Sequence, residues 1–133
     1  MSILIIGLSL SGMVFEISNP GDTNSEEISL PNDFIITPDV VIPMKVSRPG
    51  CDVEDICYIP SNIVAEKGDS ITWLNEDSSF HSVTSGFYPE PSGLFDSGHL
   101  DPYESYTLSF DEYGVYDYFC TLHPWMKAQV IVE

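Results

Sequence analysis

Three side chains with soft or borderline metal-binding atoms lie within seven residues near the end of the sequence: Cys120, His123 and Met126. Thiolate, imidazole and thioether ligands together favour copper, because soft sulfur stabilises Cu(I) and imidazole serves both oxidation states. The expected geometry is a trigonal plane of two histidines and one cysteine with a weak axial methionine. Such a plane needs a second histidine from another segment. His81, which follows a predicted strand and a polar turn, is the candidate.

Other kinds of site fit the same residues less well. Zinc favours cysteine and histidine in closed tetrahedral sets, and methionine is a poor zinc ligand. A cysteine protease needs a thiol and a base that are positioned independently, whereas only two residues separate Cys120 from His123. No segment resembles an oxyanion loop. The pattern therefore indicates a redox-active metal centre rather than a hydrolytic one.

Short β-strands must position these side chains, because from residue 40 onward short β-forming runs alternate with turn residues and no long helix is indicated. Tyr116, Tyr118 and Cys120 alternate with positions such as Asp117, so we expect the Cys120 thiol to point inward at a strand end. Many short strands at near-regular spacing are typical of an antiparallel sandwich or barrel. The predicted strands are residues 40–47, 61–65, 70–74, 82–85, 106–110, 114–120 and 127–132.

The charge balance limits the partners. The 133 residues contain 21 acidic and 4 basic side chains, which gives a net charge of −17 at pH 7. Such a surface repels nucleic acid and anionic membranes, so neither is an expected partner. A basic partner protein would be attracted, at a rate that falls as salt rises. The alternative explanation for the charge is solubility alone, including adaptation to a salty environment.

The three cysteines divide into a close pair and a single thiol. Cys51 and Cys57 bracket five residues, which leaves Cys120 alone. One disulfide and one functional thiol are the expected arrangement, and a disulfide would imply an oxidising, extracytoplasmic compartment. Three buried, reduced cysteines are the alternative.

The chain divides into three segments by composition. Residues 1–15 are mostly apolar, too few to span a bilayer with certainty, and are interpreted as a signal or anchor remnant or as an extra strand. Residues 16–39 are acidic and contain several prolines, as expected of a linker or extended arm. Residues 40–133 form the predicted domain. A membrane tether through the N-terminus is a further hypothesis.

Several motifs together resemble the cupredoxins, a family of small blue copper proteins that includes plastocyanin and amicyanin. The ligand loop has the short amicyanin-like spacing. The resemblance implies a Greek-key β-sandwich of about seven or eight strands, one type 1 copper per chain, and His81, Cys120, His123 and Met126 as its ligands. The motifs are residues 68–75, 81–84, 95–98, 114–120 and the 120–126 loop.

The resemblance also suggests which residues surround the ligands. The family usually has asparagine after the first histidine, where it ties the two ligand loops together, and this chain has Ser82 there. We expect Asn75 and Ser82 near the ligands. In the family, the histidine of the ligand loop is the electron port, so Pro124 and Trp125 would lie beside the port. Trp125 would then add to an apolar docking patch or, alternatively, pack into the core.

The implied function is transfer of single electrons between redox partner proteins by a monomer, with a basic docking surface on the partner. The alternative is a redox enzyme that acts on a small molecule such as a nitrogen oxide, at a coordination position left open if Met126 stands back. Only His99 remains for a second metal, and a surface loop position is the expectation for it. Copper storage is a third possibility, which a single buried thiol disfavours.

Overall fold

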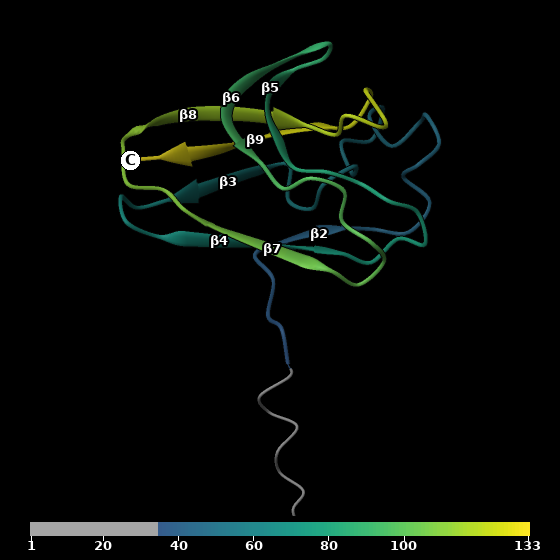
Figure 1. Ribbon diagram of the computed structural model, residues 1–133, viewed down its shortest axis with the longest axis horizontal. Coiled ribbons are helices and arrows are strands. Elements are labelled where there is room, and N and C mark those ends of the chain that lie inside the picture. The colour runs from purple at the N-terminus through teal and green to yellow at the C-terminus, as the bar shows by residue number, and fades with distance from the viewer. Residues whose placement is uncertain (1–34) are drawn as a thin grey trace, which may run out of the picture. The chain divides into compact units, whose positions relative to one another are not determined.

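The computed structural model describes residues 35–133, which form eight strands in two facing sheets (Figure 1). No helix occurs among these residues, so the predicted all-β Greek-key sandwich is confirmed. The smaller sheet has the order β2 (Val40–Ile42), β4 (Ser70–Asn75), β7 (Ser105–Ser109). The larger sheet has the order β3 (Asn62–Ala65), β9 (Lys127–Val132), β8 (Gly114–Phe119), β5 (Thr84–Phe87), β6 (Glu90–Asp96).

Strand pairing is mixed rather than purely antiparallel as expected. β2 pairs with β4, and β3 with β9, in parallel, while the other pairs are antiparallel. The physical reason is the path of the chain, which changes sheet between β2 and β3 and again between β3 and β4. Because β3 lies in the other sheet, β2 pairs with β4 instead, and two strands separated by such a crossover can run in the same direction.

The largest differences from the sequence prediction are one shortened strand and one strand that was not predicted, whereas the bounds of the other strands agree within about two residues. The first strand ends at Ile42 rather than continuing to residue 47, because Pro43 has no N–H to donate to a neighbouring strand. Strand β6 was not predicted, because Pro91 and Gly93 both disfavour strand interiors. It is tolerated because β6 is an exposed edge strand, and it forms a hairpin with β5 that projects from the larger sheet in Figure 1.

Aromatic side chains fill the space between the two sheets. Trp73 from β4 is fully buried, and its ring lies 5.5 Å from that of Tyr118 on β8 and 5.7 Å from that of Tyr106 on β7. Tyr118 also packs edge-on against Tyr58, at 4.8 Å. Offset and edge-to-face pairs of this kind add about 0.5–1.5 kcal/mol each beyond burial of their area. The core thus links both sheets and fixes the end of β8, where Cys120 follows.

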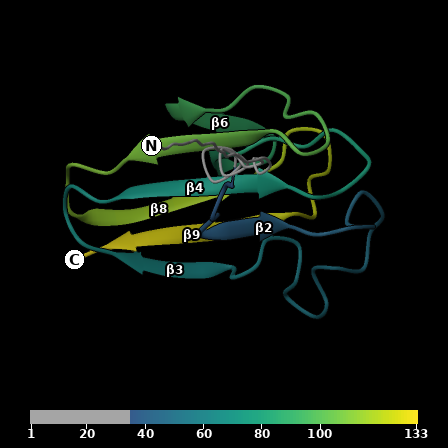
Figure 2. The same ribbon diagram turned by 90° about the horizontal axis from the view of Figure 1, so that it is seen from below.

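The loops after β2, β4 and β8 gather at one end of the sandwich, as the two views in Figures 1 and 2 show. Hydrogen bonds between main-chain groups join the ends of β2 and β4, from Glu76 N–H to the Ile42 carbonyl, and join the β6–β7 loop to the end of β4, from Tyr103 N–H to the Asn75 carbonyl. This end of the sandwich therefore holds segments that lie far apart in sequence in fixed relative positions.

The predictions made for residues 1–15, and for most of the segment 16–39, fall on residues that lie outside the described part of the chain. Within residues 35–133, no helix has the length and apolar character needed to cross a membrane.

Candidate metal centre

Three predicted ligands converge at the end of the sandwich where the loops gather. The ligand atoms of His81, Cys120 and His123 all lie within 4.8 Å of one another. The Cys120 Sγ is 3.8 Å from Nδ1 of His81 and 3.6 Å from Nδ1 of His123, and the two Nδ1 atoms are 3.1 Å apart. His81 and Cys120 are fully buried, whereas His123 is partly exposed.

The geometry of these three atoms suits a metal ion. A point equidistant from atoms with these separations lies about 2 Å from each, which matches the ~2.0–2.3 Å of metal bonds to imidazole nitrogen and thiolate sulfur. Two imidazoles and one thiolate in such a triangle are the donor set of trigonal copper sites. The residues present therefore fit a single copper ion.

The 120–126 loop places Cys120 and His123 on the same side of one tight turn. Cys120 N–H donates to the Met126 carbonyl at 3.2 Å, and Met126 N–H donates to the His123 carbonyl at 2.9 Å. The Met126 side chain is fully buried in the core. The turn thus returns the chain beside Cys120 before β9 begins at Lys127.

His81 comes from the loop between β4 and β5, which Asn75 organises. The Asn75 amide is fully buried and donates to the carbonyls of Ser79, Leu100 and Asp101 at 2.9–3.2 Å. His81 itself forms an isolated β-bridge with Leu100. The main chain of His81 is therefore held against Leu100, and the Asn75 amide ties the His81 loop to the loop that carries Leu100.

Both histidines are prepared to bind a metal as neutral rings. Burial lowers the pKa of His81, although the neighbouring Asp77 carboxylate opposes this, and burial together with the nearby His81 lowers the pKa of His123. Since both pKa values lie below the ordinary value, the rings are neutral at pH 7 and each keeps one nitrogen lone pair free for a metal.

Asp77 is a residue of the centre that sequence reasoning missed. Its Oδ2 lies 2.7 Å from Nε2 of His81, and both side chains are almost completely shielded from solvent. Its Oδ1 accepts hydrogen bonds from the main-chain N–H groups of Lys45 and Ser78, at 2.9 and 2.8 Å. Burial alone would raise the pKa of Asp77, but these bonds outweigh it and lower the pKa. The only signal in the sequence was an acidic residue four positions before His81.

Ser82 joins the two ligand loops. Its N–H points at the Cys120 Sγ, 3.4 Å away, and its hydroxyl oxygen accepts the N–H of Thr121 at 3.0 Å. The Ser82 carbonyl accepts the hydroxyl of Tyr58 at 2.6 Å. Burial raises the pKa of Tyr58 well above its ordinary value, so this hydroxyl keeps its proton. Serine thus makes the loop-to-loop bond expected of the family's asparagine.

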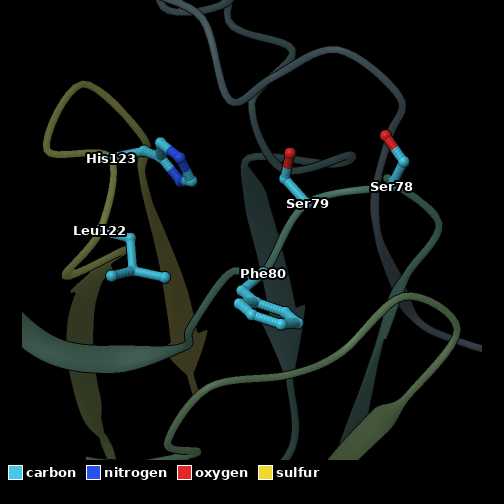
Figure 3. A pocket seen from close by; sticks show the side chains of 5 residues that line it. All are labelled: Ser78, Ser79, Phe80, Leu122 and His123. Carbon is cyan, nitrogen blue, oxygen red and sulfur yellow. The ribbon is translucent and has the colours of Figure 1, made fainter.

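A shallow pocket of about 410 Å³ opens beside His123, as Figure 3 shows. Phe80 and Leu122, at its rim, are 51% and 40% exposed, so they form the apolar part of this face. Ser78 and Ser79 complete the lining. We call the surface formed by Ser78, Ser79, Phe80, Leu122 and His123 the port face.

The other residues expected near the port lie around this face. Trp125 is half-buried and packs against the core, and its Nε1–H donates to the Val46 carbonyl at 3.0 Å. Pro124 is also partly buried. His99 is exposed and stacks on Phe80, with ring centroids 6.4 Å apart, and it is not part of the ligand cluster.

The predicted disulfide between Cys51 and Cys57 is confirmed, and Cys120 is a free, buried thiol. The bridge closes residues 51–57, the second half of a longer segment, residues 45–57, here called the stapled loop. This loop touches the centre twice, through Lys45 N–H at Asp77 and through the Val46 carbonyl at Trp125. The disulfide therefore stiffens a segment that packs directly on the two ligand loops.

Comparisons with known proteins agree with this geometry. The model of copper-binding proteins of the plastocyanin/azurin family matches residues 45–133. Amicyanin from Paracoccus versutus is 32% identical over 83 residues, which cover 61% of this chain and 61% of the relative. Plastocyanin from Scenedesmus fuscus is 32% identical over 92 residues, which cover 63% of this chain and 94% of the relative.

Among solved structures, a purple cupredoxin from Nitrosopumilus maritimus aligns with a TM-score of 0.65 at 29% identity, over 73% of this chain and 100% of that one. The chain spans about three fifths of the length of the Paracoccus amicyanins it matches. The resemblance inferred from the sequence motifs is confirmed over the segment that carries all four candidate ligands.

Proposed function

The chain belongs to the plastocyanin/azurin family of copper-binding proteins, and from that premise we propose that it binds one copper ion and carries single electrons between redox partners. His81, Cys120 and His123 would hold the ion, and Met126 is proposed as a fourth, weaker ligand. The observation that carries this proposal is the triangle of one thiolate sulfur and two imidazole nitrogens, with sides of 3.1–3.8 Å.

A copper ion held there supplies a one-electron couple between Cu(II) and Cu(I). The protein contributes a ligand set with little freedom to rearrange, because buried hydrogen bonds fix His81 and the 120–126 turn fixes Cys120. Ser82 N–H stabilises negative charge on the Cys120 sulfur. Burial of His81 and Cys120 also keeps water away from the inner side of the site. These features suit a carrier whose geometry must change little with its charge.

The port face supports exchange of electrons with a protein partner. His123 combines a ligand nitrogen near Cys120 with partial exposure at the pocket, and Phe80 and Leu122 supply apolar area around it. Small apolar patches in an otherwise polar surface are typical of transient docking sites. With a chain net charge of −17, the favoured partner carries a basic docking surface.

The disulfide supports an extracytoplasmic location, because such bonds persist mainly in oxidising compartments. Periplasm or cell surface are both consistent with it. Attachment to a membrane through residues 1–15, the arm at 16–39 and the monomeric state stay predictions.

Spectroscopy of the copper-loaded protein tests the proposal. One copper per chain and an intense visible thiolate-to-copper absorption are expected. The substitutions Cys120→Ser and His81→Gln should abolish that absorption, whereas His99→Gln, at the one histidine outside the cluster, should leave it unchanged. A Cys120→Ser protein that kept its colour would refute the assignment. Turnover of a nitrogen oxide by the pure protein would instead favour the redox enzyme.

A further inference from the structure

We propose that Asp77 is a positioning residue for the metal centre, which orients His81 through Nε2 and supplies a negative charge that favours Cu(II) over Cu(I). This inference rests on the proposed copper site and goes beyond it, since Asp77 is not one of the proposed ligands and does not line the pocket beside His123. Its basis is the buried contact between Oδ2 of Asp77 and Nε2 of His81, at 2.7 Å.

The contact decides which nitrogen of His81 is free. A carboxylate accepts a hydrogen bond from Nε2 only if Nε2 carries the proton, so the neutral ring must keep its lone pair on Nδ1. Nδ1 is the atom that faces the other ligands, 3.8 Å from the Cys120 sulfur and 3.1 Å from Nδ1 of His123. Asp77 therefore selects the form of His81 that can bind a metal in this triangle.

Asp77 cannot turn away from His81, because its other groups are also engaged. Oδ1 accepts the N–H of Lys45 and of Ser78, and the N–H of Asp77 itself donates to Oδ1 of Asn75 at 3.0 Å. Lys45 adopts a left-handed backbone conformation, with φ of 75°, at the start of the stapled loop. The carboxylate is thus held between the stapled loop and the His81 loop.

The charge of Asp77 lacks a matching cation. It is the one acidic residue buried among residues 35–133, and within that range no lysine or arginine side chain pairs with it, since its only ionisable partner is the His81 ring. A buried charge without a countercharge destabilises a protein. A metal ion bound by Nδ1 of His81 would supply the missing positive charge. The stabilisation is greater for the doubly charged ion than for the singly charged one.

The substitution Asp77→Asn tests the charge, with Asp69→Asn as the matched control. Asp69 is exposed, accepts one hydrogen bond from Glu66 N–H and precedes β4 at the end opposite Asn75. Both variants remove one negative charge. We expect Asp77→Asn to weaken Cu(II) binding about 10–100-fold, to weaken Cu(I) binding less, and so to raise the reduction potential. Asp69→Asn should change both affinities less than about twofold, because solvent and salt screen a distant surface charge.

Equal affinities and potentials in the two variants would overturn the inference. ¹⁵N NMR of the metal-free wild type tests the orientation without any substitution, so it stands even if Asp77→Asn fails to fold. His81 should show a proton on Nε2 and none on Nδ1, and the opposite tautomer would overturn the inference. A wild-type protein that bound no copper but showed the expected tautomer would refute the proposed function and leave the orienting role intact.

Discussion

The two loops that supply the imidazoles are built in opposite ways. The loop between β4 and β5 buries His81 completely: the Asp77 carboxylate accepts a hydrogen bond from the His81 ring, and the Asn75 amide donates to main-chain carbonyls around it. The loop between β8 and β9 is one short turn, and it leaves His123 partly exposed beside a pocket. Nε2 of His81 has a carboxylate partner, while the pocket-facing His123 has ring contacts to His81 and Trp125.

This difference separates two requirements of an electron carrier. The buried loop determines how the ion is held, since it controls the orientation of one ring and the charge behind it. The exposed loop determines how electrons reach the surface, since the His123 ring lies 3.6 Å from the Cys120 sulfur and also lines the pocket of the port face. Substitutions behind the His81 ring should therefore change stability and the metal centre, and substitutions of the exposed side chains around His123 should change exchange with partners.

Removal of the Asn75 side chain should have the largest effect on the buried loop. The substitution Asn75→Ala removes a fully buried side chain that donates three hydrogen bonds and accepts the N–H of Asp77. Because an orphaned buried polar group costs about 1–3 kcal/mol, we expect a loss of about 3 kcal/mol in the free energy of unfolding. Chemical denaturation of the metal-free protein measures it.

The control for that experiment is Asn62→Ala, at an exposed position in β3. It should change the free energy of unfolding by less than about 0.5 kcal/mol, as is usual for surface substitutions. Similar losses in the two variants would mean that the His81 loop does not depend on the Asn75 amide.

The fold was largely predictable from sequence because alternation reports burial directly. Tyr106, Leu108 and Phe110 alternate with exposed positions and do pack inward. Strand β6 was not predictable in this way, because an edge strand needs no alternating pattern and tolerates Pro91 and Gly93. Parallel pairing depends on where the chain changes sheet, which no local pattern encodes.

The candidate site was predictable only where side-chain type and spacing carry the chemistry. Cys120, His123 and His81 were expected to meet and do so. Asp77 was not identified, because an aspartate in a polar turn is common and its partner on the other side is the main-chain N–H of Lys45. A main-chain donor leaves no signature in the sequence. The hydrogen bond from the Trp125 ring N–H to the Val46 carbonyl could not be predicted for the same reason, since its acceptor is a main-chain group.

Shortening an apolar side chain of the port face should slow electron exchange without altering the metal centre. The substitution Leu122→Ala removes apolar contact area beside His123, from a side chain that is 40% exposed. We expect the second-order rate with a basic c-type cytochrome to fall about fivefold, equivalent to ~1 kcal/mol of lost docking energy. Stopped-flow measurements at low salt give the rate, and the visible spectrum should stay unchanged.

Leu94→Ala is the matched control, since Leu94 is 69% exposed and lies on the β5–β6 hairpin, outside the port face. Its rate should equal that of the wild type. Equal slowing by both substitutions would show that the partner docks elsewhere or binds without a preferred face.

The smallest expected effect is a gradual loss of stability of the metal-free protein in mild acid. Burial lowers the pKa of His81 and His123 in the folded state below the unfolded value of about 6.5. Between the folded and unfolded pKa values the unfolded chain binds more protons, so the free energy of unfolding falls as pH drops below about 6.5. Urea midpoints measured from pH 8 to pH 5 should decrease. His123→Ala should show a shallower decrease, because one of the two contributing rings is gone. An unchanged slope in that variant would mean that His81, in the buried loop, accounts for the whole acid sensitivity.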